Sequence, residues 1–327
     1  MGLAMTNLPI NRILPDASQL VFGCMSLGGD WGASTSSAQD LKHAHAAIDA
    51  ALAVGINFFD HADIYCRGKA ESVFGEVLKL RPELRDEIYL QSKCGIKFED
   101  EQGPQRYDFS RQWICDSVEG SLTRLGVEQL DILELHRPDP LMNPEEVAEA
   151  FTALKAAGKV KYFGVSNMSG TQMQFLQSYL PYPLVSNQLE MSLQRHSFVD
   201  EGVFAVNPDG ANINFAAGTL EYCGQNDVQI QSWGSLAQGL YTGKDISDQP
   251  IYVRQTADKV AALAGEFGVS AEAIVLAWLL RHPANIQPVI GTANPERITA
   301  CGQAGKVELS REQWYSLYVS ARGEPLP

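Results

Sequence analysis

The chain has 327 residues, of which 45% are hydrophobic and 20% charged, a composition typical of an ordinary soluble globular protein. Its formal net charge of −14 argues against a nucleic-acid-binding surface, because such a surface needs clustered lysine and arginine. The sequence also contains no apolar run long enough to span a bilayer, so we expect neither nucleic acid nor a membrane among its partners.

The cysteines and histidines suggest neither a disulfide framework nor a metal site. The six cysteines are scattered and form no CxxC pair. A large chain with dispersed cysteines and no signal peptide is most simply a reduced, cytoplasmic protein. His43 and His45 lie two residues apart, off a common helical face, so we expect no metal there.

Short apolar runs alternate with helical stretches along most of the chain. The strand-like runs are 20–25, 56–60, 87–93, 130–136, 162–167, 184–190, 228–233 and 287–291. Between them, 41–55 ends at Gly55, a natural left-handed cap, and 144–158 begins with a proline and two acidic residues, as helix starts often do. This alternation predicts a parallel sheet covered by helices.

Eight such strands are the number found in a closed (β/α)8 TIM barrel, which typically has about 250 residues. An open doubly wound sheet has the same alternation and stays possible at this point. No G-x-G occurs, and none of the four Gly-Lys pairs is followed by Ser or Thr, so neither a Rossmann fingerprint nor a P-loop is present. We predict a single barrel domain over 1–327, without a Rossmann fold. It has a long irregular loop at 191–227 and a short C-terminal helical tail that starts with a capping box at Ser310 and Gln313.

Four polar residues stand where three successive strands end. Asp60 ends the second run with Tyr65 shortly beyond it, Lys93 ends the third run, and His136 ends the fourth. In a barrel, the carboxyl ends of the strands meet at one face, so these four side chains would converge. Taken singly, each has a structural interpretation as a cap, a solvated lysine, a loop aromatic or a turn residue. Their placement together at the ends of three successive strands favours a functional interpretation.

Together these groups could protonate an oxygen that is becoming an alkoxide, as happens in carbonyl reduction. A tyrosine has an ordinary pKa near ~10 and is a poor acid at neutral pH. A buried lysine ammonium beside it favours the phenolate and makes the phenol a better proton donor. Asp60 would keep Lys93 charged and in place, and His136 could share the hydrogen bond to the substrate oxygen.

At these residues the chain resembles the aldo-keto reductases. FDHADIY, the YLQSK segment ending at Lys93 and LDILELHRPDP are similar to the catalytic motifs of that family, and the resemblance runs from about residue 19 to 303. GVSN at 164–167, NQLE at 187–190, WGSLAQGLYTGK at 233–244 and VIGTANPERI at 289–298 add to it. The resemblance implies a (β/α)8 barrel that binds a nicotinamide cofactor without a Rossmann fold. It also implies that Tyr65 is the general acid, that Lys93 and Asp60 tune it, and that His136 orients the carbonyl.

The resemblance also implies a cofactor site. Ser166, Asn167 and Gln188 would hold the nicotinamide carboxamide, and Trp233 would stack on the nicotinamide ring. The backbone amides of Leu236, Ala237 and Gly239 would cradle the pyrophosphate, and Thr292 and Arg297 would read the adenosine 2′-phosphate. The remaining positions implied for the cofactor are Met25, Gly234, Ser235, Lys244 and Gly291.

Several positions depart from the family pattern. Gly291 stands where many members carry a lysine that pairs with the 2′-phosphate, and Ala300 and Cys301 stand where Glu-Asn often holds the adenine. Cys66-Arg67 replaces a glycine-rich continuation after the tyrosine. We therefore expect NADP(H) as cofactor, with NAD(H) second to it, and a substrate mouth shaped by 97–109 and 191–227.

The expected partner is a small carbonyl or alcohol substrate, and the oligomeric state is not predicted. A second interpretation is a cofactor-binding redox sensor that regulates a partner, as in the potassium-channel β-subunits. The complete set of four site residues favours an enzyme.

Overall fold

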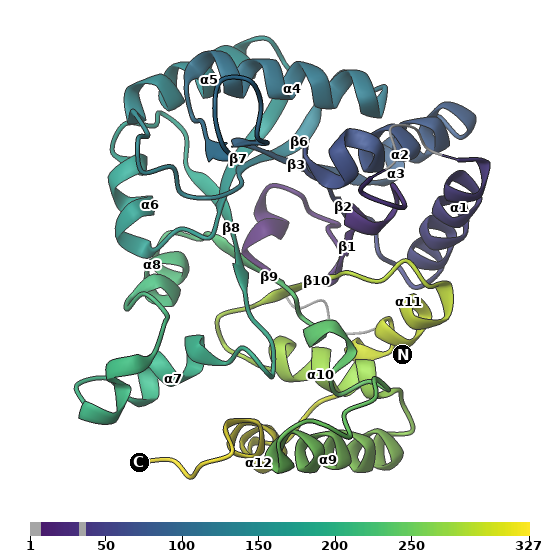
Figure 1. Ribbon diagram of the computed structural model, residues 1–327, viewed down its shortest axis with the longest axis vertical. Helices are drawn as coiled ribbons and strands as arrows, with labels where there is room; N and C mark the ends of the chain where they lie inside the picture. Colours follow the sequence, from purple (N-terminus) through teal and green to yellow (C-terminus); the bar gives the residue numbers. More distant parts are fainter. Residues whose placement is uncertain (1–7, 33–36) are drawn as a thin grey trace.

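The computed structural model describes residues 8–32 and 37–327, and in this part of the chain eight parallel strands close into a barrel (Figure 1). The strand order around the barrel is β1-β10-β9-β8-β7-β6-β3-β2. The barrel strands are β1 (Val21–Gly23), β2 (Phe58–Asp60), β3 (Tyr89–Cys94), β6 (Leu130–Leu135), β7 (Val160–Ser166), β8 (Leu184–Glu190), β9 (Gln229–Trp233) and β10 (Gln287–Ile290). Each predicted run overlaps one of these strands, and only β3, which ends at Cys94, and β7, which begins at Val160, extend beyond their runs.

Closure of the sheet decides between the two predicted architectures. Phe22 of β1 pairs with Phe59 of β2 on one side and with Ile290 of β10 on the other, so the first and last strands share a ladder. An open doubly wound sheet is therefore excluded, and the (β/α)8 prediction is confirmed.

Helices surround the barrel on its outer face (Figure 1). They are α1 (Ala38–Ala53), α2 (Lys69–Leu80), α3 (Leu84–Glu87), α4 (Arg111–Leu125), α5 (Pro144–Ala156), α6 (Gly170–Gln177), α7 (Ser197–Val203), α8 (Thr219–Gln225), α9 (Ile251–Phe267), α10 (Ala271–Leu280), α11 (Pro295–Cys301) and α12 (Arg311–Arg322). The two helices predicted in detail correspond to α1 and α5. Gly55 follows α1 with φ +81°, and the Ser310–Gln313 capping box starts α12, both as predicted.

The amino-terminal segment closes one end of the barrel. Leu8, Ile10 and Leu14 are buried and pack in one apolar cluster with Val21 of β1 and Phe58 of β2. This cluster fills the barrel next to the amino ends of its strands. The predicted catalytic residues Asp60, Lys93 and His136 stand at or just after the opposite ends of their strands.

The two segments predicted to shape the substrate mouth contain regular structure. The 191–227 segment holds α7, the 3₁₀ helix η4 (Pro208–Asn212) and α8, so its prediction as one long irregular loop is wrong. The helix α7 is fastened to α12, because Asp200 accepts a hydrogen bond from Tyr318 Oη at 2.5 Å and pairs with Arg322 Nε at 3.1 Å. The 97–109 segment contains most of a short hairpin of β4 (Ile96–Lys97) and β5 (Arg106–Tyr107). Its ladder is two residues long on each side, too short to leave a periodic signal.

Within the described residues, no single helix is long and apolar enough to cross a membrane. The pair α9 and α10 reaches that length and composition only jointly, and the two helices are bent by 95° relative to each other. The same part of the chain contains no group of three or more His, Cys, Asp or Glu side chains arranged to hold a metal ion.

Candidate active site

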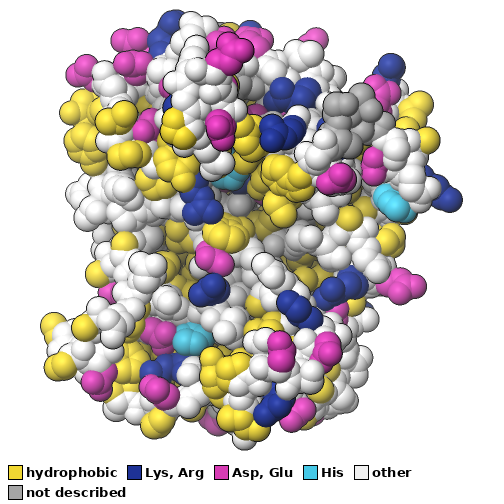
Figure 2. All heavy atoms as spheres, in the orientation of Figure 1, with side chains coloured by type: hydrophobic (Ala, Val, Ile, Leu, Met, Phe, Trp, Pro, Cys, Tyr) yellow, Lys and Arg dark blue, Asp and Glu magenta, His cyan; other side chains and the backbone are white. Residues whose placement is uncertain are grey.

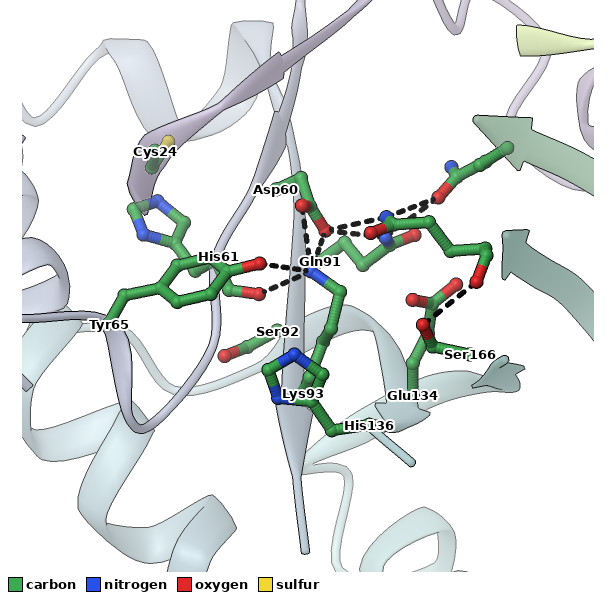
Figure 3. A network of polar contacts seen from close by, with 12 residues as sticks. Cys24, Asp60, His61, Tyr65, Gln91, Ser92, Lys93, Glu134, His136 and Ser166 are labelled. Carbon is green, nitrogen blue, oxygen red and sulfur yellow. Dashed lines mark hydrogen bonds and ion pairs between the residues drawn. The ribbon is translucent and has the colours of Figure 1, made fainter. Parts of the chain in front are cut away.

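The four predicted catalytic residues meet at the carboxyl end of the barrel (Figure 3). Asp60 is the last residue of β2, Lys93 lies near the end of β3, and His136 directly follows β6. Tyr65 begins the short 3₁₀ helix η3 (Tyr65–Gly68), five residues after Asp60. In the orientation of Figure 1, the centre of the molecule is hollowed, and lysine or arginine side chains lie beside hydrophobic ones around the hollow (Figure 2).

The Lys93 ammonium is the centre of the site. Its Nζ lies 2.6 and 2.7 Å from the two carboxylate oxygens of Asp60 and donates to the His61 carbonyl oxygen at 2.9 Å. A fourth contact, at 3.1 Å, joins Nζ to the phenol oxygen of Tyr65. Lys93 is 1% exposed and Asp60 is 2% exposed, so this ion pair is held away from water.

Electrostatics keep the lysine charged and the tyrosine protonated. Burial alone would lower the pKa of Lys93, but the charge of Asp60 raises it above its ordinary value. Burial raises the pKa of Tyr65 to about 12, while Lys93 acts to lower it and Asp60 to raise it. The lowering by Lys93 that the sequence predicted is therefore present, but burial outweighs it.

His136 stands beside the phenol as a neutral imidazole. Its ring centroid lies 5.9 Å from that of Tyr65, with the planes at 81°. Burial, followed by the positive charges of Lys93 and Arg137, holds the pKa of His136 well below its usual range. The buried Nδ1 atom of this ring has no hydrogen-bond partner among the described residues.

A row of glutamine side chains inside the barrel supports Asp60. Gln91 Nε2 donates to Asp60 Oδ1 at 2.7 Å, and Gln188 Nε2 donates to the same oxygen at 3.2 Å. Both glutamines also donate to Gln231, which in turn donates to Gln287 at 3.1 Å. Of these four glutamines, only Gln188 has a role implied by the sequence. The other three leave no distinct signal, because β3 (YLQSKC) and β9 (QIQSW) carry further polar residues and Gln287 stands at the very start of β10.

The three residues predicted to hold a carboxamide form one hydrogen-bonded group with Trp233 next to His136. Trp233 Nε1 donates to Asn167 Oδ1 at 3.0 Å, and Asn167 Nδ2 donates to Ser166 Oγ at 2.8 Å and to the His136 carbonyl at 3.2 Å. Ser166 Oγ donates to the Gln188 carbonyl at 2.8 Å. Asn167 has φ +60°, a left-handed conformation that turns its amide toward these neighbours.

The turn after β9 has the irregular backbone expected of a phosphate loop. Gly234, Ala237 and Gly239 have φ values of +67°, +48° and +82°. The amides of Ala237 and Gly239 donate within the turn, to the carbonyls of Gly234 at 2.8 Å and Leu236 at 2.9 Å. Ser235 Oγ donates to the Val289 carbonyl at 2.8 Å and ties the turn to β10. A pyrophosphate bound here would have to share these amides with the turn.

Arg297 lies next to this turn and already has partners. Its Nε lies 3.2 Å from Glu272 Oε1, and one terminal nitrogen donates to Thr242 Oγ1 at 2.7 Å. A side chain built at Gly239 would come within 3.4 Å of the same guanidinium. The predicted pyrophosphate turn and the predicted 2′-phosphate residue are thus brought together.

The other predicted cofactor residues lie toward the edge of the site. Met25 is 48% exposed, and Lys244 and Gly291 are also exposed. Thr292 Oγ1 accepts a hydrogen bond from the Asn294 amide at 3.2 Å. A Cβ atom at Gly291 would meet no atom within 4 Å, so this position faces open space.

The loop that carries Tyr65 is built around two strained residues. Cys66 and Arg67 have φ values of +49° and +58°, which explains why glycine is favoured after the tyrosine in the family pattern. The Cys66 thiol donates to the carbonyls of Met25 at 3.2 Å and Gly29 at 3.3 Å, and Arg67 lies over the ring of Phe98 at 4.7 Å. These contacts hold Cys66 and Arg67 in a left-handed conformation that glycine adopts more readily.

With this fold and this site, the comparisons identify the family. Residues 19–318 match the aldo/keto reductase family, so the chain belongs to it and is an oxidoreductase of that class. It is 39% identical over 279 residues to the uncharacterized oxidoreductase YcsN of Bacillus subtilis (strain 168), covering 84% of this chain and 86% of that protein. It is 38% identical over 318 residues to a 6-dehydroglucose reductase of Agrobacterium fabrum, covering 94% and 96%.

A solved structure has the same fold. The crystal structure of an aldo/keto reductase from Klebsiella pneumoniae in complex with NADP and acetate superimposes with a TM-score of 0.71 at 23% identity. The superposition covers 95% of this chain and 93% of that one. At this identity the likeness supports the barrel architecture.

Proposed function

We propose that the protein is an NADP(H)-dependent reductase that converts an aldehyde or ketone to an alcohol, with Tyr65 as general acid. The observation that carries the proposal is the contact of Lys93 Nζ with both Asp60 and Tyr65 Oη, inside a buried site. A phenol beside a fixed ammonium can release a proton because the charge that forms on its oxygen is stabilised at once.

The residues next to this centre fit a nicotinamide dinucleotide. Trp233 offers an aromatic face, and Asn167 and Ser166 offer amide and hydroxyl groups to a carboxamide. The turn at 234–239 has backbone that can approach a phosphate closely, with the Arg297 guanidinium beside it. The cofactor, when bound, supplies the hydride; the protein supplies position and the proton.

Each side chain of the site has its own role in the reaction. The neutral His136 ring donates a hydrogen bond that orients the carbonyl oxygen, and Tyr65 Oη gives that oxygen its proton. The resulting phenolate is stabilised by Lys93, which Asp60 and the His61 carbonyl keep in position. The low polarity around these buried groups strengthens each of these interactions.

The choice of NADP(H) over NAD(H) rests on Arg297. Its planar guanidinium can bind a phosphate with two parallel hydrogen bonds. Because Glu272 already pairs with it, a 2′-phosphate must compete with that carboxylate. We therefore propose a moderate preference for NADP(H).

The test is NADPH oxidation by the purified protein with aldehydes, ketones, quinones and 6-dehydroglucose, the last chosen from the name of the Agrobacterium relative. Tyr65→Phe should slow turnover by a factor of ~10²–10⁴ and leave NADPH binding intact, because its hydroxyl faces the substrate. Tyr179→Phe, which alters an exposed tyrosine just after α6, is the matched control and should behave as wild type.

Two outcomes would contradict the proposal. Equal turnover by Tyr65→Phe and wild type would show that Tyr65 is not the acid. Tight NADPH binding with no turnover of any compound in the panel would favour the role of a cofactor-binding sensor instead.

A further inference from the structure

A second buried carboxyl group lies next to the catalytic residues. Glu134 is on β6, is 0% exposed, and pairs in register with Lys93 of β3 (Figure 3). One of its oxygens, Oε1, accepts a hydrogen bond from Ser186 Oγ at 2.6 Å. The other, Oε2, is buried and has no hydrogen-bond partner among the described residues. The function proposed above does not use this group.

The contact between Glu134 and Ser186 spans three strands. Ser186 is on β8, and β7 lies between it and β6. The β7 residue in register with Glu134 is Gly164, and a Cβ atom at that position would lie 2.0 Å from Ser186 Oγ. The hydrogen bond therefore depends on a glycine in the intervening strand. Glu134, Gly164 and Ser186 therefore fit one another across three strands. This arrangement is more specific than is needed to fill the barrel interior.

The surroundings of Glu134 keep its carboxyl group neutral. The charged or titratable groups around it are Lys93 from β3, Asp60 from β2, Tyr65 from η3 and His136 directly after β6, whereas β7 and β8 present Gly164 and Ser186, which do not titrate. Burial raises the pKa of Glu134 to about 8, with Lys93 acting to lower it and Asp60 to raise it. At neutral pH the buried cluster then carries one negative charge, on Asp60, and one positive charge, on Lys93.

We propose that Glu134 is a positioning residue for the reaction: as a neutral acid it leaves the Lys93 ammonium to Asp60 and Tyr65, and its ionisation weakens Tyr65 as a proton donor. This inference rests on the proposed role of Tyr65 as general acid. The physical reason is that a second negative charge in the cluster stabilises the protonated phenol against the phenolate. Glu134 is already among the groups that raise the pKa of Tyr65.

The proposal predicts a specific pH profile. The rate of hydride transfer from NADPH to a carbonyl substrate, measured in a single turnover between about pH 6 and about pH 10, should fall as Glu134 ionises. We expect a fall of about 3- to 10-fold in wild type, centred near the pKa of about 8. Glu134→Gln should remove this fall, because its amide oxygen can still accept from Ser186 but the side chain cannot ionise.

Ser186→Ala is a second test, because a purely structural role for Glu134 predicts no change in the pH at which the rate falls. The hydroxyl of Ser186 acts to lower the pKa of Glu134, so its removal should move the fall to higher pH. The double variant Glu134→Gln/Ser186→Ala should show no fall. Fluorescence titration with NADPH establishes that each variant is folded and binds the cofactor.

Two results would overturn the inference. One is a Glu134→Gln profile that falls at the same pH and by the same factor as wild type. The other is a Glu134→Gln rate that is reduced equally at every pH, which would indicate packing alone. Near-wild-type turnover by Tyr65→Phe is a different failure, because it would reject the proposed function whatever the Glu134 profile.

Discussion

Lys93 Nζ lies 2.6 Å from Asp60 Oδ1 and 3.1 Å from Tyr65 Oη, so one buried ammonium joins the carboxylate and the phenol. Removing either partner of a buried ion pair leaves the other charge uncompensated, which typically costs about 3–5 kcal/mol of unfolding free energy. The pair thus has two separable consequences, one for stability and one for proton transfer.

Lys93→Met should show both consequences. We expect a loss of hydride-transfer rate of about 10²–10⁴-fold, because the phenolate loses its counter-charge, and a loss of stability from the unpaired Asp60. Stopped-flow single-turnover kinetics measures the first and urea unfolding the second. Lys93→Met/Asp60→Asn should recover stability but not rate. Recovery of rate in the double variant would show that Lys93 does not act on Tyr65.

Arg297 should control the discrimination between NADPH and NADH. Arg297→Ala should raise the dissociation constant for NADPH about 10-fold or more, since a hydrogen bond to a charged group is worth about 1.5–3 kcal/mol, and should change that for NADH little. Fluorescence titration, reading the quenching of Trp233, measures both constants. Arg254→Ala is the control, because Arg254 is an exposed residue of α9 whose guanidinium donates to the Ser247 carbonyl. Equal weakening of both cofactors by Arg297→Ala would argue for adenine stacking alone.

Gly291→Lys should strengthen NADPH binding. A side chain at Gly291 meets no atom within 4 Å, so a lysine can be added without displacing its neighbours. The added ammonium would lie close to Thr292 and could pair with a 2′-phosphate, lowering the dissociation constant for NADPH several-fold but not that for NADH. Gly224→Lys adds the same charge at another open position, in α8, and controls for net charge. An equal gain with Gly224→Lys would point to the overall charge of the molecule instead.

The barrel and the four central residues could be predicted because each leaves a local signal. Every barrel strand overlaps a short run that was recognised as strand-like, and Asp60, Lys93 and His136 each stand at the end of such a run. Resemblance then added the cofactor residues. Asn167 hydrogen-bonds to both Ser166 and Trp233, although Trp233 lies 66 residues later in the sequence.

Other features had no local signal because they depend on distant partners. The helix α7 is held by contacts of Asp200 with α12, more than 100 residues later in the chain. Cys66 and Arg67 take conformations that their own preferences disfavour, so a local rule predicts glycine there. The environment of Glu134 is set by a hydrogen bond to Ser186, and that bond is permitted by Gly164. A sequence pattern within one strand cannot reveal a contact that depends on three strands.

Gly164→Ala tests how closely β7 and β8 pack at the contact between Glu134 and Ser186. The new Cβ would lie 2.0 Å from Ser186 Oγ and 3.0 Å from the Ser186 carbonyl oxygen, so the strands must shift. We expect a loss of about 1–3 kcal/mol in unfolding free energy, measured by urea denaturation. Gly265→Ala in α9 is the matched control. Its Cβ meets nothing within 4 Å, and alanine in a helix should stabilise the protein by about 0.5–1 kcal/mol. In Gly164→Ala/Ser186→Ala the clash with Oγ is gone while that with the carbonyl remains, so stability should return in part. A Gly164→Ala variant as stable as wild type would mean that β7 and β8 have room to separate.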